Sequence, residues 1–226
     1  MNSKEYIEEM FPFDKPLTSR QRKDFVEYLA LEILNYCFNN EYRDYFVADK
    51  PDIQNKDMSV GIEVTEAITK KDAQIEGEFV KFCLKGDEKS KERSKAIIKD
   101  NGGRLEELGL SYPVKNSKIE KEIFQNAIKN KMDKLTSYKE KGFEKMGLFL
   151  YYGEPPIPFK LDEIKSGFDE VLLQYKDKYD WLFFSYHCGI IYYDIKANDM
   201  QVIKIEREKY DKLQYDARIY VDTKIK

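Results

Sequence analysis

Apolar residues recur along much of this chain with the spacing of an α-helix, so that one side of each such segment is apolar. Capping boxes at residues 18–21 and 117–120 mark two helix starts, and the run Asn101-Gly102-Gly103 marks a helix end. These signals predict helices over residues 19–39, 67–85, 90–100, 117–141 and 161–175.

Shorter stretches of continuous apolar residues are typical of buried β-strands. They predict strands over residues 45–48, 60–64, 147–152, 180–184, 189–195 and 201–205, with a polar turn over 54–59. The first two strands are expected to pair as a hairpin, whereas the helix between the third and fourth makes those two parallel. The sequence therefore predicts an α/β fold in which a mixed central β-sheet is flanked by helices.

With 226 residues, of which 42% are hydrophobic, the chain is long enough for one domain with a sizeable core. We expect a single domain over residues 1–226, with an N-terminal arm at 1–18 and a C-terminal extension at 206–226. Residues 105–113 are expected to be an irregular connection, and the pattern of the last twenty residues predicts no element.

The cysteines and the histidine exclude several classes of site. The three cysteines, Cys37, Cys83 and Cys188, are far apart and lack CxxC spacing, which disfavours a disulfide framework or a zinc knuckle. His187 is the only histidine, so a Ser-His-Asp or Cys-His site would depend on it alone. Residues 1–10 do not have the pattern of a signal peptide, and no apolar run is long enough to span a membrane. We therefore expect a cytoplasmic protein with no membrane partner.

Two carboxylates flank the predicted polar turn. Asp52 follows Lys50-Pro51 at the end of one extended segment, and Glu63 lies between Ile62 and Val64 in the next. If the two segments pair, Asp52 and Glu63 converge on one point, as carboxylates that hold a hard divalent cation do. The alternative is that Pro51-Asp52 is an ordinary turn and that Glu63 is simply exposed.

Three further charged residues fall on apolar helix faces. Glu32 lies among Phe25, Leu29 and Tyr36, where a carboxylate needs a metal ion or a lysine as its partner, or forms an ordinary buried salt bridge. Lys131 projects from the centre of the apolar face of 117–141, with Lys134 beside it. Lys131 either extends its ammonium group to solvent or pairs with Glu32, Asp52 or Glu63.

The run Pro51-Asp52 followed by Glu63-Val64-Thr65 resembles the motif of the PD-(D/E)xK nuclease superfamily. A helix with an inward glutamate precedes the hairpin and further helices follow it, which is the order of that superfamily. Thr65 departs from the pattern, because it stands where the family usually has its lysine. Some members are understood to supply that lysine from a neighbouring helix.

The resemblance implies a restriction-endonuclease-like fold and a Mg²⁺- or Mn²⁺-dependent nuclease. Asp52 and Glu63 would hold the metal, with the Val64 carbonyl as a further ligand and Glu32 bound directly or through water. Lys131 is the first choice for the displaced catalytic lysine and Lys134 the second, while Thr65 could at most orient a water molecule.

Nucleic acid is the partner that this resemblance implies. Residues 81–145 hold 17 Lys/Arg against 11 Asp/Glu, although the whole chain has a net charge of −3. Such a basic segment suits the backbone of a nucleic acid, and it equally suits ordinary solvated helices.

Two other functions stay open. The first is a nuclease-like domain that has lost catalysis with its motif lysine and binds nucleic acid or a protein. The second is a protein-interaction module, in which some of the 17 tyrosines and 14 phenylalanines form an aromatic surface.

Overall fold

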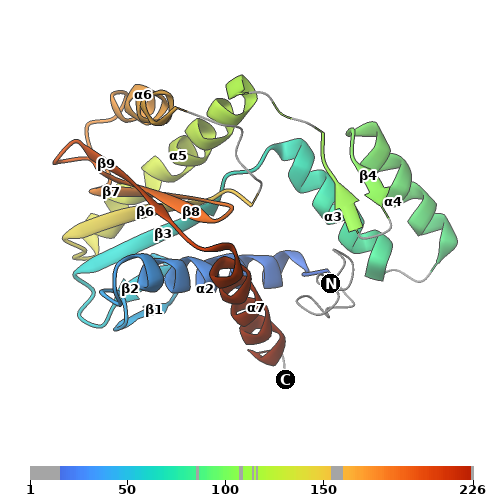
Figure 1. Ribbon diagram of the computed structural model, residues 1–226, viewed down its shortest axis with the longest axis horizontal. Helices are drawn as coiled ribbons and strands as arrows, with labels where there is room; N and C mark the ends of the chain where they lie inside the picture. The colour runs from blue at the N-terminus through green and yellow to red at the C-terminus, as the bar shows by residue number, and fades with distance from the viewer. Residues whose placement is uncertain are drawn as a thin grey trace. The chain divides into compact units, whose positions relative to one another are not determined.

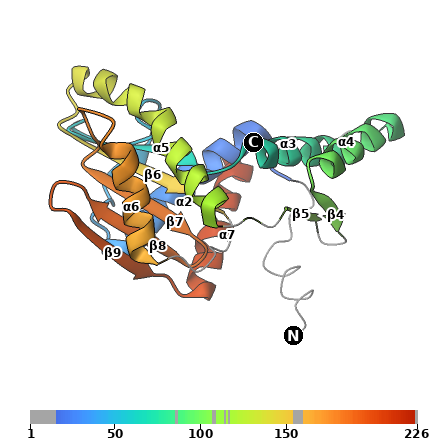
Figure 2. The same ribbon diagram turned by 90° about the horizontal axis from the view of Figure 1, so that it is seen from above.

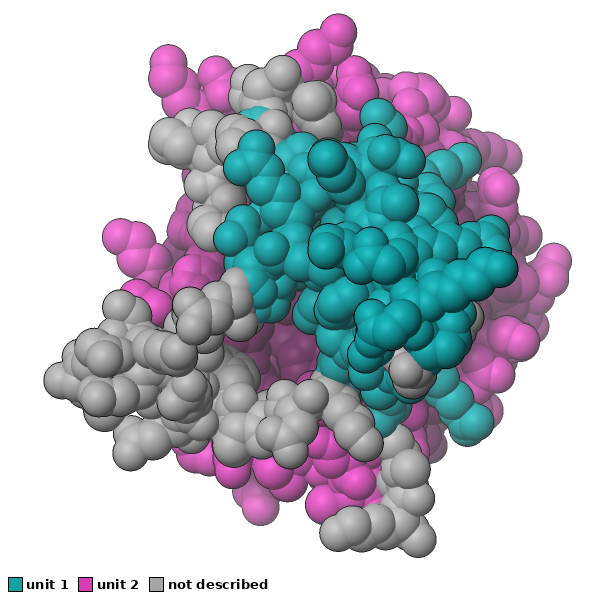
Figure 3. Space-filling view, turned by 90° about the vertical axis from the view of Figure 1, so that its right-hand side faces the viewer, with its two compact units in different colours: residues 1–23, 68–115 teal, residues 24–67, 116–226 magenta. Residues whose placement is uncertain are grey.

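The computed structural model describes residues 16–84, 87–106, 109–113, 115, 117–153 and 160–224 (Figure 1). They form two compact units, which Figure 3 colours separately. Unit 1 comprises residues 1–23 and 68–115, and unit 2 comprises residues 24–67 and 116–226. Most of the predicted N-terminal arm lies outside the described residues.

Unit 2 is built on a mixed sheet that has seven strands within the described residues. The strands are β1 (Tyr45–Val47), β2 (Ile53–Asn55), β3 (Val60–Glu66), β6 (Lys145–Tyr151), β7 (Trp181–Tyr186), β8 (Gly189–Asp194) and β9 (Asp199–Lys204). Their order in the sheet is β1-β2-β3-β6-β7-β8-β9. The pairs β3–β6 and β6–β7 are parallel and the other pairs are antiparallel. The predicted α/β class with a mixed central sheet is confirmed.

Helices cover both faces of this sheet (Figures 1 and 2). The helices of unit 2 are the greater part of α2 (Ser19–Cys37), α5 (Ser117–Glu140), α6 (Leu161–Leu172) and α7 (Arg207–Lys224). On one face, α5 and α6 enclose a core with β6 and β7 that includes Phe124, Phe168 and Phe184. On the other face, α2 lies against the sheet and α7 lies beside α2.

Two predictions about unit 2 need correction. Residues 53–55 were predicted largely as turn, yet they form β2, the middle strand of an antiparallel trio. Only Ile53 of this strand is buried, so the segment has too little apolar alternation to be recognised. Within the last twenty residues, Arg207–Lys224 form α7, whose buried positions Tyr210, Leu213, Ala217 and Val221 have helical spacing. Tyrosine and alanine carry part of that stripe, which weakens its apolar signal.

Unit 1 is helical with a small hairpin. It contains α3 (Lys70–Leu84), α4 (Glu88–Asp100), β4 (Arg104–Glu106) and β5 (Gly109–Ser111). The β4–β5 hairpin lies where the sequence predicted an irregular connection. Glu76 of α3 accepts a hydrogen bond from Tyr112 and pairs with Arg22 from the first turn of α2, at 2.8 and 3.4 Å. Residues 68–115, the larger part of unit 1, lie in the sequence between β3 and α5, so unit 1 is largely an insertion into unit 2.

Gly61 allows Pro51 to lie directly on β3. A Cβ atom at Gly61 would overlap Pro51 Cγ and lie 3.0 Å from Met146 Sδ and 3.1 Å from Phe143 Cδ1. Pro51 is buried and immediately precedes Asp52. The missing side chain at Gly61 therefore helps to fix where Asp52 enters the sheet.

Gly61→Ala is expected to destabilise the fold by about 1–3 kcal/mol, because the added methyl group forces Pro51 and its neighbours apart. Gly77→Ala is the matched control, since a Cβ at this position in α3 meets no atom within 4 Å. That change should stabilise by about 0.5–1 kcal/mol, as alanine does in a helix interior. Urea denaturation measures both, and equal effects of the two substitutions would contradict the proposed role of Gly61.

Candidate functional site

Asp52 and Glu63 converge, but the predicted hairpin between residues 45–48 and 60–64 is wrong, because β1 pairs with β2 and β2 pairs with β3. Ile53, the first residue of β2, pairs with Ile62 of the antiparallel β3, so Asp52 immediately before β2 lies opposite Glu63. Glu63 is fully buried, and Asp52 is 5% exposed. The Val64 N–H donates a hydrogen bond to Asp52 Oδ2 at 2.8 Å. Two carboxylates thus meet in a buried position, and a backbone amide fixes one of them.

One face of α5 is directed at Glu63. The ammonium groups of Lys131 and Lys134 lie 2.5 and 2.6 Å from Glu63 Oε1, and the Tyr138 hydroxyl donates to Glu63 Oε2. These three residues are three and four positions apart, so they share one side of the helix. Of the three carboxylates that the sequence offered as partners of Lys131, the partner is therefore Glu63.

Burial and neighbouring charges move the two carboxyl pKa values in opposite directions. Burial acts to raise the pKa of Glu63, but Lys131, Lys134 and Tyr138 together outweigh it and hold that pKa below its usual range. Burial and the nearby charge of Glu63 raise the pKa of Asp52. The lysines therefore stabilise the charged form of Glu63, whereas the pKa of Asp52 stays above its usual value.

Glu27 is a third carboxyl group at this site, which the sequence reasoning missed. It lies on α2, is 5% exposed, and shares a hydrogen bond with the side chain of Asp52. Two carboxyl groups can share a hydrogen bond only when one of them carries a proton. Glu27 follows Val26 and lies on one helical face with Ala30, Leu31 and Leu34, so the apolar surroundings of Glu27 were the available signal.

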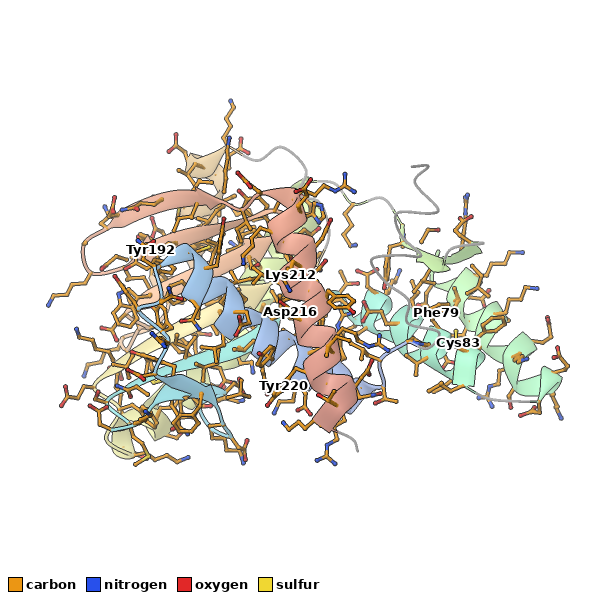
Figure 4. The ribbon with its side chains drawn as sticks, turned by 60° about the horizontal axis from the view of Figure 1, so that its bottom comes forward. Phe79, Cys83, Tyr192, Lys212, Asp216 and Tyr220 are labelled. Atoms are coloured by element: carbon orange, nitrogen blue, oxygen red, sulfur yellow. The ribbon has the colours of Figure 1, made fainter. Side chains whose placement is uncertain are left out.

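Glu32, the glutamate that the sequence suggested, lies elsewhere. It is half-buried, forms a hydrogen bond with Tyr28, and has its pKa raised by burial and by Asp216 of α7. Figure 4 shows Lys212, Asp216 and Tyr220 along α7, and the Tyr220 ring stacks on Tyr28 with centroids 4.0 Å apart. The buried face of α2 also excludes Tyr36, which is 40% exposed, so the predicted stripe was centred on the wrong part of the helix.

Tyr179 is a second residue that sequence reasoning missed. It is 1% exposed, and its hydroxyl donates to the main-chain carbonyl of Lys131 at 2.8 Å. This bond holds the turn of α5 that carries Lys131. Burial and the charges of Glu63 and Asp52 raise the pKa of Tyr179, so the hydroxyl stays protonated and able to donate.

Thr65 is half-buried and lies two residues beyond Glu63 on β3, so its side chain is on the same face of the sheet as that of Glu63.

The donor chemistry fits a hard divalent cation, because Glu27, Asp52 and Glu63 offer carboxylate oxygens. In the part of the chain that the structure describes, however, no three His, Cys, Asp or Glu side chains are already arranged to hold a metal ion. Lys131, Lys134 and Tyr138 engage both oxygens of Glu63. A cation at this position would have to displace at least one of these contacts.

Comparisons with known proteins add no relative. Neither the family models, nor the curated proteins, nor the solved structures include a match to this chain. Among the described helices, none has the length and apolar character needed to cross a membrane.

Asp52→Asn is expected to stabilise the fold at pH 7 by about 1 kcal/mol, because it removes a buried carboxyl group beside Glu63. The pKa of Asp52 in the folded state lies above its ordinary value of 3.8. The folded state therefore loses stability as the pH rises from 3.8 through this higher pKa. Asparagine removes this loss and can still accept from Val64. Chemical denaturation between pH 4 and 8 measures the difference, and a less stable variant throughout would contradict the account.

Glu63→Gln should have the opposite effect and cost about 3 kcal/mol at pH 7, because it leaves two ammonium groups without their carboxylate. The lowered pKa of Glu63 means that its contribution is present above pH 4.5 and lost as pH falls below that value. Glu122→Gln, an exposed change on α5, is the control in the same denaturation experiment. Similar midpoints for the two variants would show that the ion cluster does not stabilise the fold.

Proposed function

We propose that this chain is a divalent-metal-dependent nuclease of the PD-(D/E)xK type, which hydrolyses phosphodiester bonds. The observation that carries the proposal is the convergence of Asp52 and Glu63 on adjacent strands, with Lys131 and Lys134 reaching Glu63 from α5. A buried carboxylate pair with lysines beside it is the set of groups that phosphodiester hydrolysis needs.

The order of the elements supports the same proposal. A helix with an inward glutamate, Glu27, comes first, followed by antiparallel strands that bear Asp52 and Glu63. The parallel strands β6 and β7 complete a mixed sheet with helices on both faces. A restriction-endonuclease-like fold has this arrangement, so the sheet agrees with the resemblance of Pro51-Asp52 and Glu63-Val64-Thr65.

In this proposal Asp52, Glu63 and Glu27 would hold Mg²⁺ or Mn²⁺, with the Val64 carbonyl as a further ligand. Such an ion would polarise the phosphate and lower the pKa of a water molecule. Glu27, rather than Glu32, is the helix carboxylate, because it already contacts Asp52. Thr65 has no charge to offer, so it orients at most a water molecule.

Lys131 and Lys134 divide two tasks. The Lys131 side chain is 17% exposed and its turn is held by Tyr179, whereas the Lys134 side chain is 45% exposed. The fixed Lys131 is the better candidate to orient the attacking water and offset charge in the transition state. The more exposed Lys134 is better able to leave Glu63 for a phosphate oxygen.

A non-catalytic nuclease-like domain that binds nucleic acid or a protein is the second candidate. It is favoured by the engagement of both Glu63 oxygens by Lys131, Lys134 and Tyr138. In that case the cluster would be a structural ion pair that joins α5 to the sheet.

The test is cleavage of labelled single- and double-stranded DNA and RNA with Mg²⁺ or Mn²⁺. Wild type should cut at least one of these substrates, and Asp52→Asn or Glu27→Gln should lower the rate by roughly 100-fold or more, as loss of a charge-stabilising group does. Glu32→Gln is the matched control on the same helix and should cut as wild type. No cleavage of any substrate by the wild type would favour the non-catalytic domain.

Single-site lysine variants separate the two proposed tasks. Lys131→Ala should abolish most of the cleavage while Mn²⁺ binding, measured by calorimetry, persists. Lys134→Ala should mainly raise the substrate concentration needed for half-maximal rate, because a phosphate contact is lost. Full activity in both variants would exclude a lysine of α5 from the mechanism.

A further inference from the structure

An exposed aromatic side chain lies on the same face of the sheet as the carboxylate site. Phe46 is the middle residue of β1, the edge strand beside β2 (Figure 1), and it is 42% exposed. An exposed aromatic residue on an edge strand favours unwanted pairing with other chains, so edge strands usually carry charge there instead. Phe46 therefore presents an exposed ring at the edge of the sheet that is closer to Glu63.

The register assigns the face on which Phe46 lies. Phe46 pairs with Gln54, Gln54 pairs with Gly61, and residues that pair directly across strands project to the same side. Gly61 and Glu63 are two residues apart on β3, so they too share a side. Phe46 therefore projects to the face from which α5 approaches Glu63.

Contacts on the opposite face agree with this assignment. The neighbour Tyr45 makes an edge-to-face contact with Tyr42, in the turn that follows α2, with centroids 5.0 Å apart. Because successive strand residues alternate, Phe46 projects away from α2. Ile53 and Ile62, which alternate with Asp52 and Glu63, are both fully buried.

The distance from Phe46 to the site suits one nucleic-acid strand. Phe46 and Glu63 are separated by two strand spacings, about 10 Å, and two residues along the strand, about 7 Å. The direct separation is thus about 12 Å, which a strand covers within a few nucleotides. Lys134 is 45% exposed beside Glu63, and Lys50, next to Pro51, is 66% exposed. Lys134 is bound to Glu63 and Lys50 lies 3.8 Å from Asp49, but both side chains are exposed enough to exchange these partners for a phosphate oxygen.

We propose that Phe46 is a stacking platform for an unpaired base, so that the site accepts single-stranded nucleic acid. A base can lie on an aromatic ring only when it has left its own stack, and such stacking tolerates any base. Lys50 and Lys134 hold the neighbouring phosphates, and the strand runs from β1 across to Asp52 and Glu63. This inference rests on the proposed nuclease function and specifies its substrate class.

The test is fluorescence anisotropy with labelled single strands and a hairpin duplex of matched length, in EDTA, on the Asp52→Asn background. Single strands should bind more tightly than the duplex. Phe46→Ala and Phe46→Leu should weaken single-strand binding by roughly 5- to 100-fold, as loss of one stacked base does, and Phe46→Trp should restore it. Val202→Ala is the control, because Val202 is 44% exposed on the other edge strand, β9.

Three results would overturn the inference. In the first, Phe46→Ala and its parent bind single strands with equal affinity. In the second, the duplex binds more tightly than single strands. In the third, Phe46→Ala changes only the oligomeric state, as measured by light scattering. Cleavage by the wild type is measured separately. Phe46-dependent binding without any cleavage would support the platform and contradict the nuclease, whereas cleavage with Phe46-independent binding would do the reverse.

Discussion

A fully buried carboxylate, that of Glu63, is the group on which the centre of unit 2 depends. An unpaired charge at this depth would be too costly to keep, so the fold must bring positive charge to it. Helix α5 does so with Lys131 and Lys134, and Tyr138 completes the set of hydrogen bonds. The same contacts therefore fix α5 on the sheet and define the candidate site.

The arrangement places three buried or nearly buried carboxyl groups, those of Glu27, Asp52 and Glu63, close to two lysines. Asp52 lies next to Glu63 and shares a hydrogen bond with Glu27, while the ammonium groups of Lys131 and Lys134 are bound to Glu63. The pKa of Asp52 is raised, first by burial and then by the charge of Glu63. A fold selected only for stability would have little use for a second buried acid here. A site that receives a cation would use it directly.

The sequence predicts the parts of this site that depend on local pattern. The meeting of Asp52 with Glu63 and the direction of Lys131 toward the sheet follow from local spacing, although the strand that pairs with β3 is β2 and not β1. Long-range packing decides the rest. Glu27 rather than Glu32 meets Asp52 because α7 lies beside α2 and contacts Tyr28, and α7 itself has a weak apolar stripe. The polar strand β2 is likewise defined by its two partners.

Calorimetric titration of Mn²⁺ into the wild type and into the double variant Asp52→Ala/Glu63→Ala, each with a short single strand present, tests the central claim most directly. The account predicts saturable binding by the wild type that is lost in the double variant, with both proteins folded by circular dichroism. The same heat of binding in both proteins, or none in the wild type, would contradict a metal site at these carboxylates.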